Sequence, residues 1–150
     1  MTIRPATVED FGALRALAQA FIAESGLPGG YDLDRTERSI RRILDEKRIP
    51  ILVAERENTV IGGIIATIEA AWTVDPWCYV QVFYVRPDWR ATYVARDLVE
   101  ALCRTADAAG CAATFAASTA AAGGKVDMLF TNLFAKYGFR PLGPTMVRPR

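Results

Sequence analysis

Apolar residues recur at helical spacing near the start of the chain, after a short run at residues 2–5 that favours a strand. Thr7 and Asp10 have the spacing of a capping box, which predicts that a helix begins there. Leu14 and Phe21 belong to the apolar face of this helix. Turn residues from Gly26 onward predict its end.

A second, highly charged helix is predicted after the turn-forming residues 27–31. Asp34 and Glu37 offer a capped start, and Ile40 and Leu44 point to one apolar face. Arginines on this segment alternate with acids, which is typical of a solvated helix face rather than of a surface that binds nucleic acid.

Extended structure is predicted from Ile49, with an aromatic loop at residues 72–77 before the strand that ends at Val85. Residues 51–53 are uninterruptedly apolar, a turn near Asn58 follows, and residues 60–70 complete a hairpin. Residues 78–85 alternate strictly, so each face of that strand carries its own set of side chains. The two sets are Val80, Val82 and Tyr84 on one side and Tyr79, Gln81 and Phe83 on the other.

The second half of the chain begins at Pro87, which ends this strand. A helix with a continuous apolar face then runs to Gly110, and a strand is expected at 112–117. A last helix is predicted over 127–137, followed by an extended segment over 139–147. The order β-α-α-β-β-β-α-β-α-β predicts an α/β fold, a mixed sheet with helices on both faces.

Composition narrows the class of protein. A chain of 150 residues, 51% apolar, suits one domain spanning 1–150. No apolar run is long enough to cross a membrane, and no signal-peptide core is present, so we expect a cytoplasmic protein. A net charge of +1 gives no general attraction for nucleic acid or membranes. The absence of histidine excludes Ser-His and Cys-His nucleophile pairs, and the three cysteines lack metal-ligand spacing, so no metal is expected.

Candidate chemistry concentrates in the segment from Phe83 to Arg96, a strand end, a tight turn and a helix start. The first amides of a helix have no partner within the helix and bind anions, phosphates above all. Arg90 and Arg96 add positive charge beside them. An alternative is that both arginines are ordinary solvated residues flanking a helix start.

This segment resembles the cofactor motif of the Gcn5-related N-acetyltransferase (GNAT) family, with Arg90-Ala-Thr-Tyr93-Val-Ala95 in place of Arg/Gln-x-x-Gly-x-Gly/Ala. The segment from Asn132 to Gly143 is similar to the closing helix, Gly-Phe and strand of that family. The opening Ile-Arg-Pro-Ala-Thr-Val-Glu-Asp and the hairpin at 54–63 also resemble it, so the likeness covers nearly the whole chain.

The resemblance implies a GNAT fold whose central strands 4 and 5 splay apart to receive acetyl-CoA, a co-substrate that requires no metal. It implies transfer of an acetyl group to a small-molecule or peptide amine by direct attack. The cofactor-binding residues that it implies are Phe83, Tyr84, Val85, Arg90, Ala91, Thr92, Tyr93, Val94, Ala95, Arg96, Asp127 and Phe134.

Three positions depart from the family pattern. Tyr93 replaces a glycine, and its ring either crowds the pyrophosphate or turns outward and leaves the amide available. Gln81 stands where relatives carry a glutamate base, and an amide takes no proton at neutral pH. Phe134 replaces a tyrosine acid, which leaves the hydroxyl of Tyr137 as a candidate, or as a residue that only packs in the core. The alternative function is therefore a catalytically weak or silent acyl-CoA-binding or regulatory protein.

Acceptor contacts in this family come from the first helices and the loop before strand 4. The residues at these places are Glu24, Tyr31, Trp72, Trp77 and Tyr79. Aromatic rings with a carboxylate would suit a cationic amine. Scattered surface aromatics are the alternative, and the tryptophans could instead form a homodimer contact.

Overall fold

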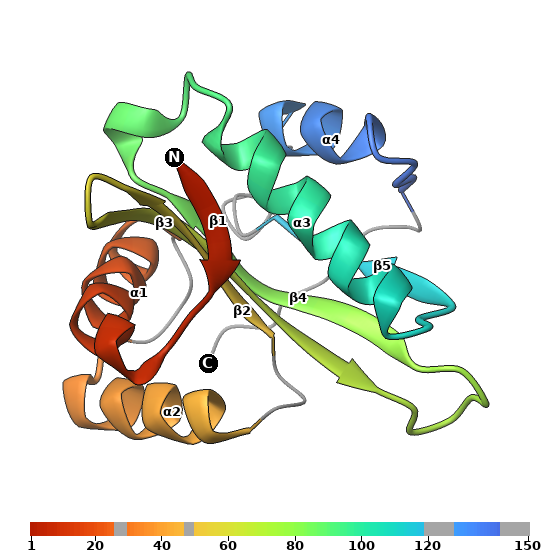
Figure 1. Ribbon diagram of the computed structural model, residues 1–150, viewed down its shortest axis with the longest axis horizontal. Helices are drawn as coiled ribbons and strands as arrows, with labels where there is room; N and C mark the ends of the chain where they lie inside the picture. The colour runs from red at the N-terminus through yellow and green to blue at the C-terminus, as the bar shows by residue number, and fades with distance from the viewer. Residues whose placement is uncertain (26–29, 47–49, 119–127, 142–150) are drawn as a thin grey trace.

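The computed structural model shows a twisted sheet with helices on both faces (Figure 1). The residues that it describes are 1–25, 30–46, 50–118 and 128–141.

Five strands form the sheet in the order β1-β2-β3-β4-β5. They are β1 (Thr2–Pro5), β2 (Ile51–Arg56), β3 (Thr59–Glu69), β4 (Trp77–Val85) and β5 (Ala113–Phe115). The first four pair antiparallel, and β4 pairs with β5 in parallel. The β2–β3 hairpin turns at Glu57 and Asn58, both with positive φ, as a two-residue type I′ turn requires. The predicted hairpin and mixed α/β sheet are confirmed.

Helices cover the two faces of the sheet in pairs (Figure 1). They are α1 (Phe11–Ser25), α2 (Leu33–Asp45), α3 (Val94–Ala108) and α4 (Met128–Ala135), with single 3-10 turns at Val8–Asp10 and Pro87–Trp89. On one face, α1 and α2 pack through Leu14 and Ile40 onto Val53. On the other, Leu98 and Leu102 of α3 are almost completely buried against the sheet, and each contributes roughly 1.5–3 kcal/mol by leaving water.

Charged side chains fix the start of α1. The carboxylate of Asp10 accepts the backbone N–H of Thr7 at 2.8 Å and two guanidinium bonds from Arg4 at 2.7 and 2.9 Å. Hydrogen bonding to Arg4 lowers the pKa of Asp10, although burial opposes this shift. The start of α2 differs from the prediction: Asp32, not Asp34, accepts the N–H of Arg35 at 2.9 Å, because the helix begins one residue after Asp32.

A β-bulge interrupts β4 at Gln81. Neighbouring residues Ile65 and Ala66 of β3 face Val82 and Val80, so Gln81 is the extra residue. The predicted strict alternation of this strand is therefore wrong: Val80 and Phe83 pack against the same core cluster beneath α3. Beyond a bulge, each side chain lies on the opposite face of the sheet from the one that uninterrupted alternation would give it.

Beyond the bulge, β4 and β5 part. β5 pairs only with Trp77 to Tyr79, at the start of β4, and the rest of β4 has no β5 residue beside it. This is the splayed arrangement expected for strands 4 and 5. β5 is shorter than the predicted strand at 112–117. Asp127 and most of the expected strand at 139–147 lie outside the described residues.

Candidate active site

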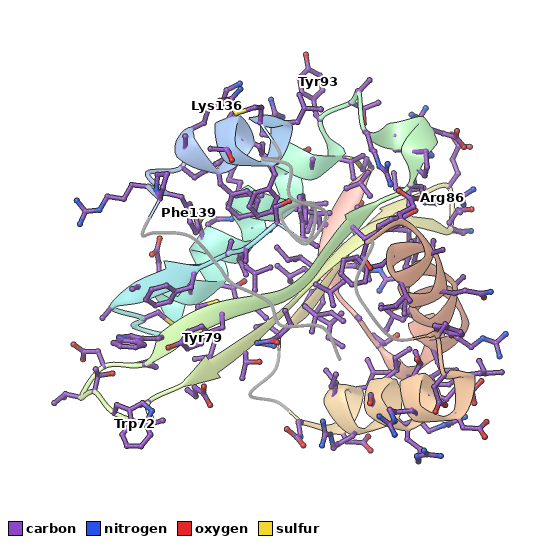
Figure 2. The ribbon with its side chains drawn as sticks, turned by 180° about the vertical axis from the view of Figure 1, so that it is seen from behind. Trp72, Tyr79, Arg86, Tyr93, Lys136 and Phe139 are labelled. Carbon is purple, nitrogen blue, oxygen red and sulfur yellow. The ribbon has the colours of Figure 1, made fainter. Side chains whose placement is uncertain are left out.

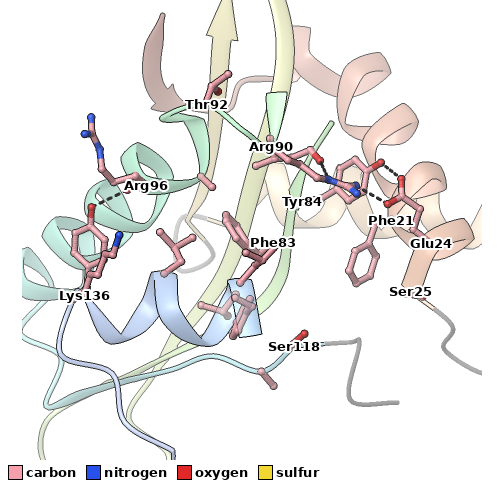
Figure 3. Close-up of a pocket in the computed structure, with 18 of the residues that line it drawn as sticks. Phe21, Glu24, Ser25, Phe83, Tyr84, Arg90, Thr92, Arg96, Ser118 and Lys136 are labelled. Carbon is pink, nitrogen blue, oxygen red and sulfur yellow. Dashed lines mark hydrogen bonds and ion pairs between the residues drawn. The ribbon is translucent and has the colours of Figure 1, made fainter. Parts of the chain in front are cut away.

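A cavity of about 730 Å³ lies where β4 runs on past β5 (Figure 3). Its walls come from the last turn of α1, the second half of β4, the segment leading into α3, and α4. Residues 117 and 118, just after β5, complete it. The divergence of the strands therefore opens a space that reaches from the α1 side of the sheet to the α3 side.

Eight of the twelve expected cofactor-binding residues line this cavity, and all eight lie in one stretch of sequence between positions 83 and 96. They are Phe83, Tyr84, Val85, Arg90, Thr92, Tyr93, Ala95 and Arg96.

The start of α3 offers backbone donors to the cavity. The first i to i−4 hydrogen bond at this end of the helix runs from the amide of Asp97 to the carbonyl of Tyr93 at 2.9 Å. The amides of Ala95 and Arg96 precede it, and among the described residues neither has an acceptor. Together with the positive end of the helix dipole, they favour an anion.

Tyr93 does not block this helix start. Its side chain is 69% exposed and points away from the molecule (Figure 2), with the Arg96 guanidinium 4.4 Å from its ring centroid. The backbone is ordinary, with φ −75° and ψ −3°, so no glycine is required. Of the two arrangements considered for this phenol, the structure has the outward one.

Positive side chains at the cavity are partly neutralised. Arg96 forms an ion pair with Asp97, which lies next to it on α3. Arg90 pairs with Glu24 of α1 at 2.5 Å and donates its Nε–H to the carbonyl of Val85 at 2.8 Å. Lys136, which the sequence analysis did not single out, also lines the cavity.

The two candidate catalytic residues both line the cavity. Gln81 is exposed at the bulge, where its amide can hydrogen-bond but cannot accept a proton at neutral pH. The Tyr137 hydroxyl donates to the carbonyl of Arg96 at 3.3 Å, and burial raises its pKa. Tyr137 thus spans α3 and the end of α4 instead of packing in the core.

Three expected cofactor-binding residues do not line the cavity. The side chains of Val94 and Phe134 are 1% and 2% exposed, because both belong to the packed interior, and Ala91 faces solvent. The Phe134 ring packs against those of Phe83 and Phe139 with centroids 5.7 and 5.0 Å apart. Phe134 therefore supports the cavity wall from behind.

Most expected acceptor residues lie elsewhere. Glu24 lines the cavity, whereas Tyr31, Trp72, Trp77 and Tyr79 do not. Trp77 and Tyr79 belong to the part of β4 that still pairs with β5, and Trp72 is 91% exposed on the loop before it (Figure 2). This placement has a topological cause, because the cavity lies at the opposite end of β4.

Other residues of the wall were not anticipated. They are Phe21, Ser25, Val80, Ala117, Ser118, Leu129, Phe130, Leu133 and Lys136. Phe21 was assigned only to an apolar helix face. Of the closing helix and its flanks, only Asp127, Phe134 and Tyr137 had been connected with the cofactor or its chemistry.

Within the described ranges, no three His, Cys, Asp or Glu side chains gather as metal ligands, and no helix is long and apolar enough to span a membrane. Cys78 is buried, which raises the pKa of its thiol to about 11.

Comparison with known protein families identifies the class of protein to which this chain belongs. The sequence profile of the acetyltransferase (GNAT) family matches residues 14–139, which is most of the chain. The chain belongs to this family. The comparison with curated protein sequences gave no match.

Solved structures share the fold at low sequence identity. Aminoglycoside acetyltransferase AAC(6')-Iy, in complex with a bisubstrate analogue, is 18% identical with a TM-score of 0.76, over 99% of this chain and 97% of that one. A predicted acetyltransferase from Clostridium acetobutylicum with acetyl-CoA is 16% identical with a TM-score of 0.79, over 98% and 94%. Aminoglycoside 6'-N-acetyltransferase AAC(6')-IG from Acinetobacter haemolyticus is 17% identical with a TM-score of 0.75, over 100% and 98%.

Proposed function

We propose that this protein is an N-acetyltransferase that moves an acetyl group from acetyl-CoA to an amine. The observation that carries the proposal is the cavity at the parting of β4 and β5, which extends to the unpaired amides at the start of α3. A long, flexible ligand with a diphosphate suits a space with this shape and these donors.

The residues present fit such a ligand. The amides of Ala95 and Arg96 would hold the diphosphate, and Lys136 on the cavity wall would add positive charge. Exposed backbone of β4 near Phe83 would pair with the amides of the pantetheine arm. The carbonyl of Val85 is already the acceptor of Arg90 Nε–H, so its share in that pairing is reduced.

Acetyl-CoA supplies an acetyl group activated as a thioester. The reaction forms an amide N–C bond, breaks the C–S bond, and needs one proton removed from the amine and one given to sulfur. Gln81 can orient an amine or a water but cannot take the proton. Holding the amine in place is worth roughly 7–11 kcal/mol of barrier lowering, whereas an absent acid or base costs about 10²–10⁴-fold each. The expected enzyme is therefore slow, with water as proton carrier.

A second function, acyl-CoA binding without turnover, is favoured by the amide at Gln81 and by the burial of Phe134. Both functions share the cavity and differ only in turnover. The acceptor of the active form would be a small-molecule or peptide amine, and the relatives named for aminoglycosides make that class the first to try.

Binding and turnover are tested in sequence. CoA at about 100 times its dissociation constant should add about 2.7 kcal/mol to the free energy of unfolding of the wild type. Absence of any thermal shift with CoA and acetyl-CoA rejects both functions. Where binding is seen, thiol release from acetyl-CoA with an aminoglycoside, a polyamine and a peptide decides between them.

A further inference from the structure

Glu24 holds two partners at the α1 end of the cavity (Figure 3). One carboxylate oxygen accepts the Tyr84 hydroxyl at 2.5 Å, and the other accepts Nη2 of Arg90 at 2.5 Å. These hydrogen bonds lower the pKa of Glu24 against the opposing effect of burial, so it is ionised at neutral pH. The carboxylate is thus present as an anion whose charge Arg90 cancels.

The Glu24–Arg90 pair joins the two sides of the cavity. Glu24 lies in the last turn of α1, which covers one face of the sheet, whereas Arg90 precedes α3, which covers the other. Arg90 is also held by the Val85 carbonyl and lies 5.2 Å over the Tyr84 ring. A ligand bound at the start of α3 therefore shares its cavity with the guanidinium that pairs with Glu24.

The pair is weak enough to exchange partners. Its side chains are 42% and 46% exposed, and ion pairs at such exposure shift an equilibrium by about fivefold at most. A phosphate offers a guanidinium two parallel charge-assisted hydrogen bonds and a larger charge than a carboxylate. An incoming diphosphate can therefore take Arg90 from Glu24.

Glu24 has surroundings suited to a cation once Arg90 is withdrawn. The rings of Phe21 and Tyr84 line the same end of the cavity, edge to face with centroids 6.5 Å apart. A carboxylate beside aromatic rings attracts an ammonium group through charge and through the ring faces.

We propose that Glu24 is the residue that recognises a cationic acceptor, and that Arg90 shields it until an anionic cofactor occupies the start of α3. This proposal rests on the proposed function. Two consequences follow: Glu24 opposes cofactor binding by competing for Arg90, and cofactor and cationic amine strengthen each other's binding.

Calorimetric titration of CoA into variants tests the first consequence. Glu24→Gln keeps shape but loses charge, so we expect CoA to bind about 2- to 5-fold tighter than to wild type. In an Arg90→Gln background, Glu24→Gln should leave the affinity for CoA unchanged, because the competition acts through Arg90. Glu37→Gln is the matched control, since it breaks the Arg15–Glu37 pair, 3.0 Å long and remote from the cavity.

The outcomes separate the explanations. Unchanged or weaker CoA binding in Glu24→Gln overturns the proposal. The proposal is also overturned if Glu24→Gln tightens CoA binding equally with and without Arg90, because that result would indicate only the removal of a nearby negative charge. A wild type that binds no CoA instead overturns the proposed function.

The second consequence is that cofactor and cationic amine strengthen each other's binding. It is tested by titrating CoA in ethylammonium chloride and, for comparison, in sodium chloride at equal ionic strength. Ethylammonium chloride should lower the dissociation constant of CoA for wild type and not for Glu24→Gln, by reciprocal linkage. The same response in both proteins would overturn acceptor recognition by Glu24.

Discussion

Replacing Phe134 by tyrosine would restore the residue that the family pattern carries at this position, yet we expect it to destabilise the protein. Phe134 is 2% exposed, and aromatic rings surround it, with the Phe130 centroid at 4.3 Å. A hydroxyl added to this ring would enter an apolar cluster instead of the cavity. A buried hydroxyl without a partner costs about 1–3 kcal/mol.

For a domain of this size, that cost lowers Tm by roughly 2–12 °C, at about 2–4 °C per kcal/mol. Phe130→Tyr is the control, because Phe130 lies one turn earlier on α4, lines the cavity and is only partly buried. We expect its free energy of unfolding to stay within about 0.5 kcal/mol of wild type.

The assay is urea unfolding of the two variants together with thiol release from acetyl-CoA. Phe134→Tyr should lose stability without gaining rate. If it is as stable as wild type and releases thiol faster, its hydroxyl reaches the cavity, and the account of Phe134 as a buried support is refuted.

Three further predictions concern other sites. Gln81→Glu should raise kcat for thiol release at least about tenfold, because it supplies a proton acceptor, while CoA affinity changes far less, because the amides at the start of α3 and Arg90 are untouched. An unchanged kcat would contradict the role given to this position. Tyr93→Ala should leave CoA affinity within about twofold and stability within about 0.5 kcal/mol, since the ring points outward; a tenfold loss measured by calorimetry would show that the phenol binds the ligand. Asp10→Asn should lower the free energy of unfolding, measured with urea at neutral pH, by about 2–3 kcal/mol, because it weakens the bonds with Arg4. The exposed Asp34→Asn should lower it little. Because the folded-state pKa of Asp10 is lowered, the gap between wild type and Asp10→Asn should close as pH falls below about 4; a gap independent of pH would refute the charge-based explanation.

Local patterns along the chain determined most of the architecture. The 3.6-residue spacing in α3, the turn at Asn58 and the capping residue Asp10 each specify an element from its own few residues. The segment before α3 was predicted as an anion site for the same reason, because a strand end, a turn and a helix start are contiguous in sequence.

Only the tertiary structure decided which residues meet across the sheet. The bulge at Gln81 changes the facing of β4 through its register with β3, and register is a property of two strands. Glu24 and Arg90, 66 residues apart, come together because α1 and the start of α3 flank the same end of β4. Trp77 and Tyr79 lie away from the cavity because β5 pairs with them. A sequence pattern records the neighbours of a residue along the chain, whereas the shape and charge of this cavity depend on neighbours that folding alone supplies.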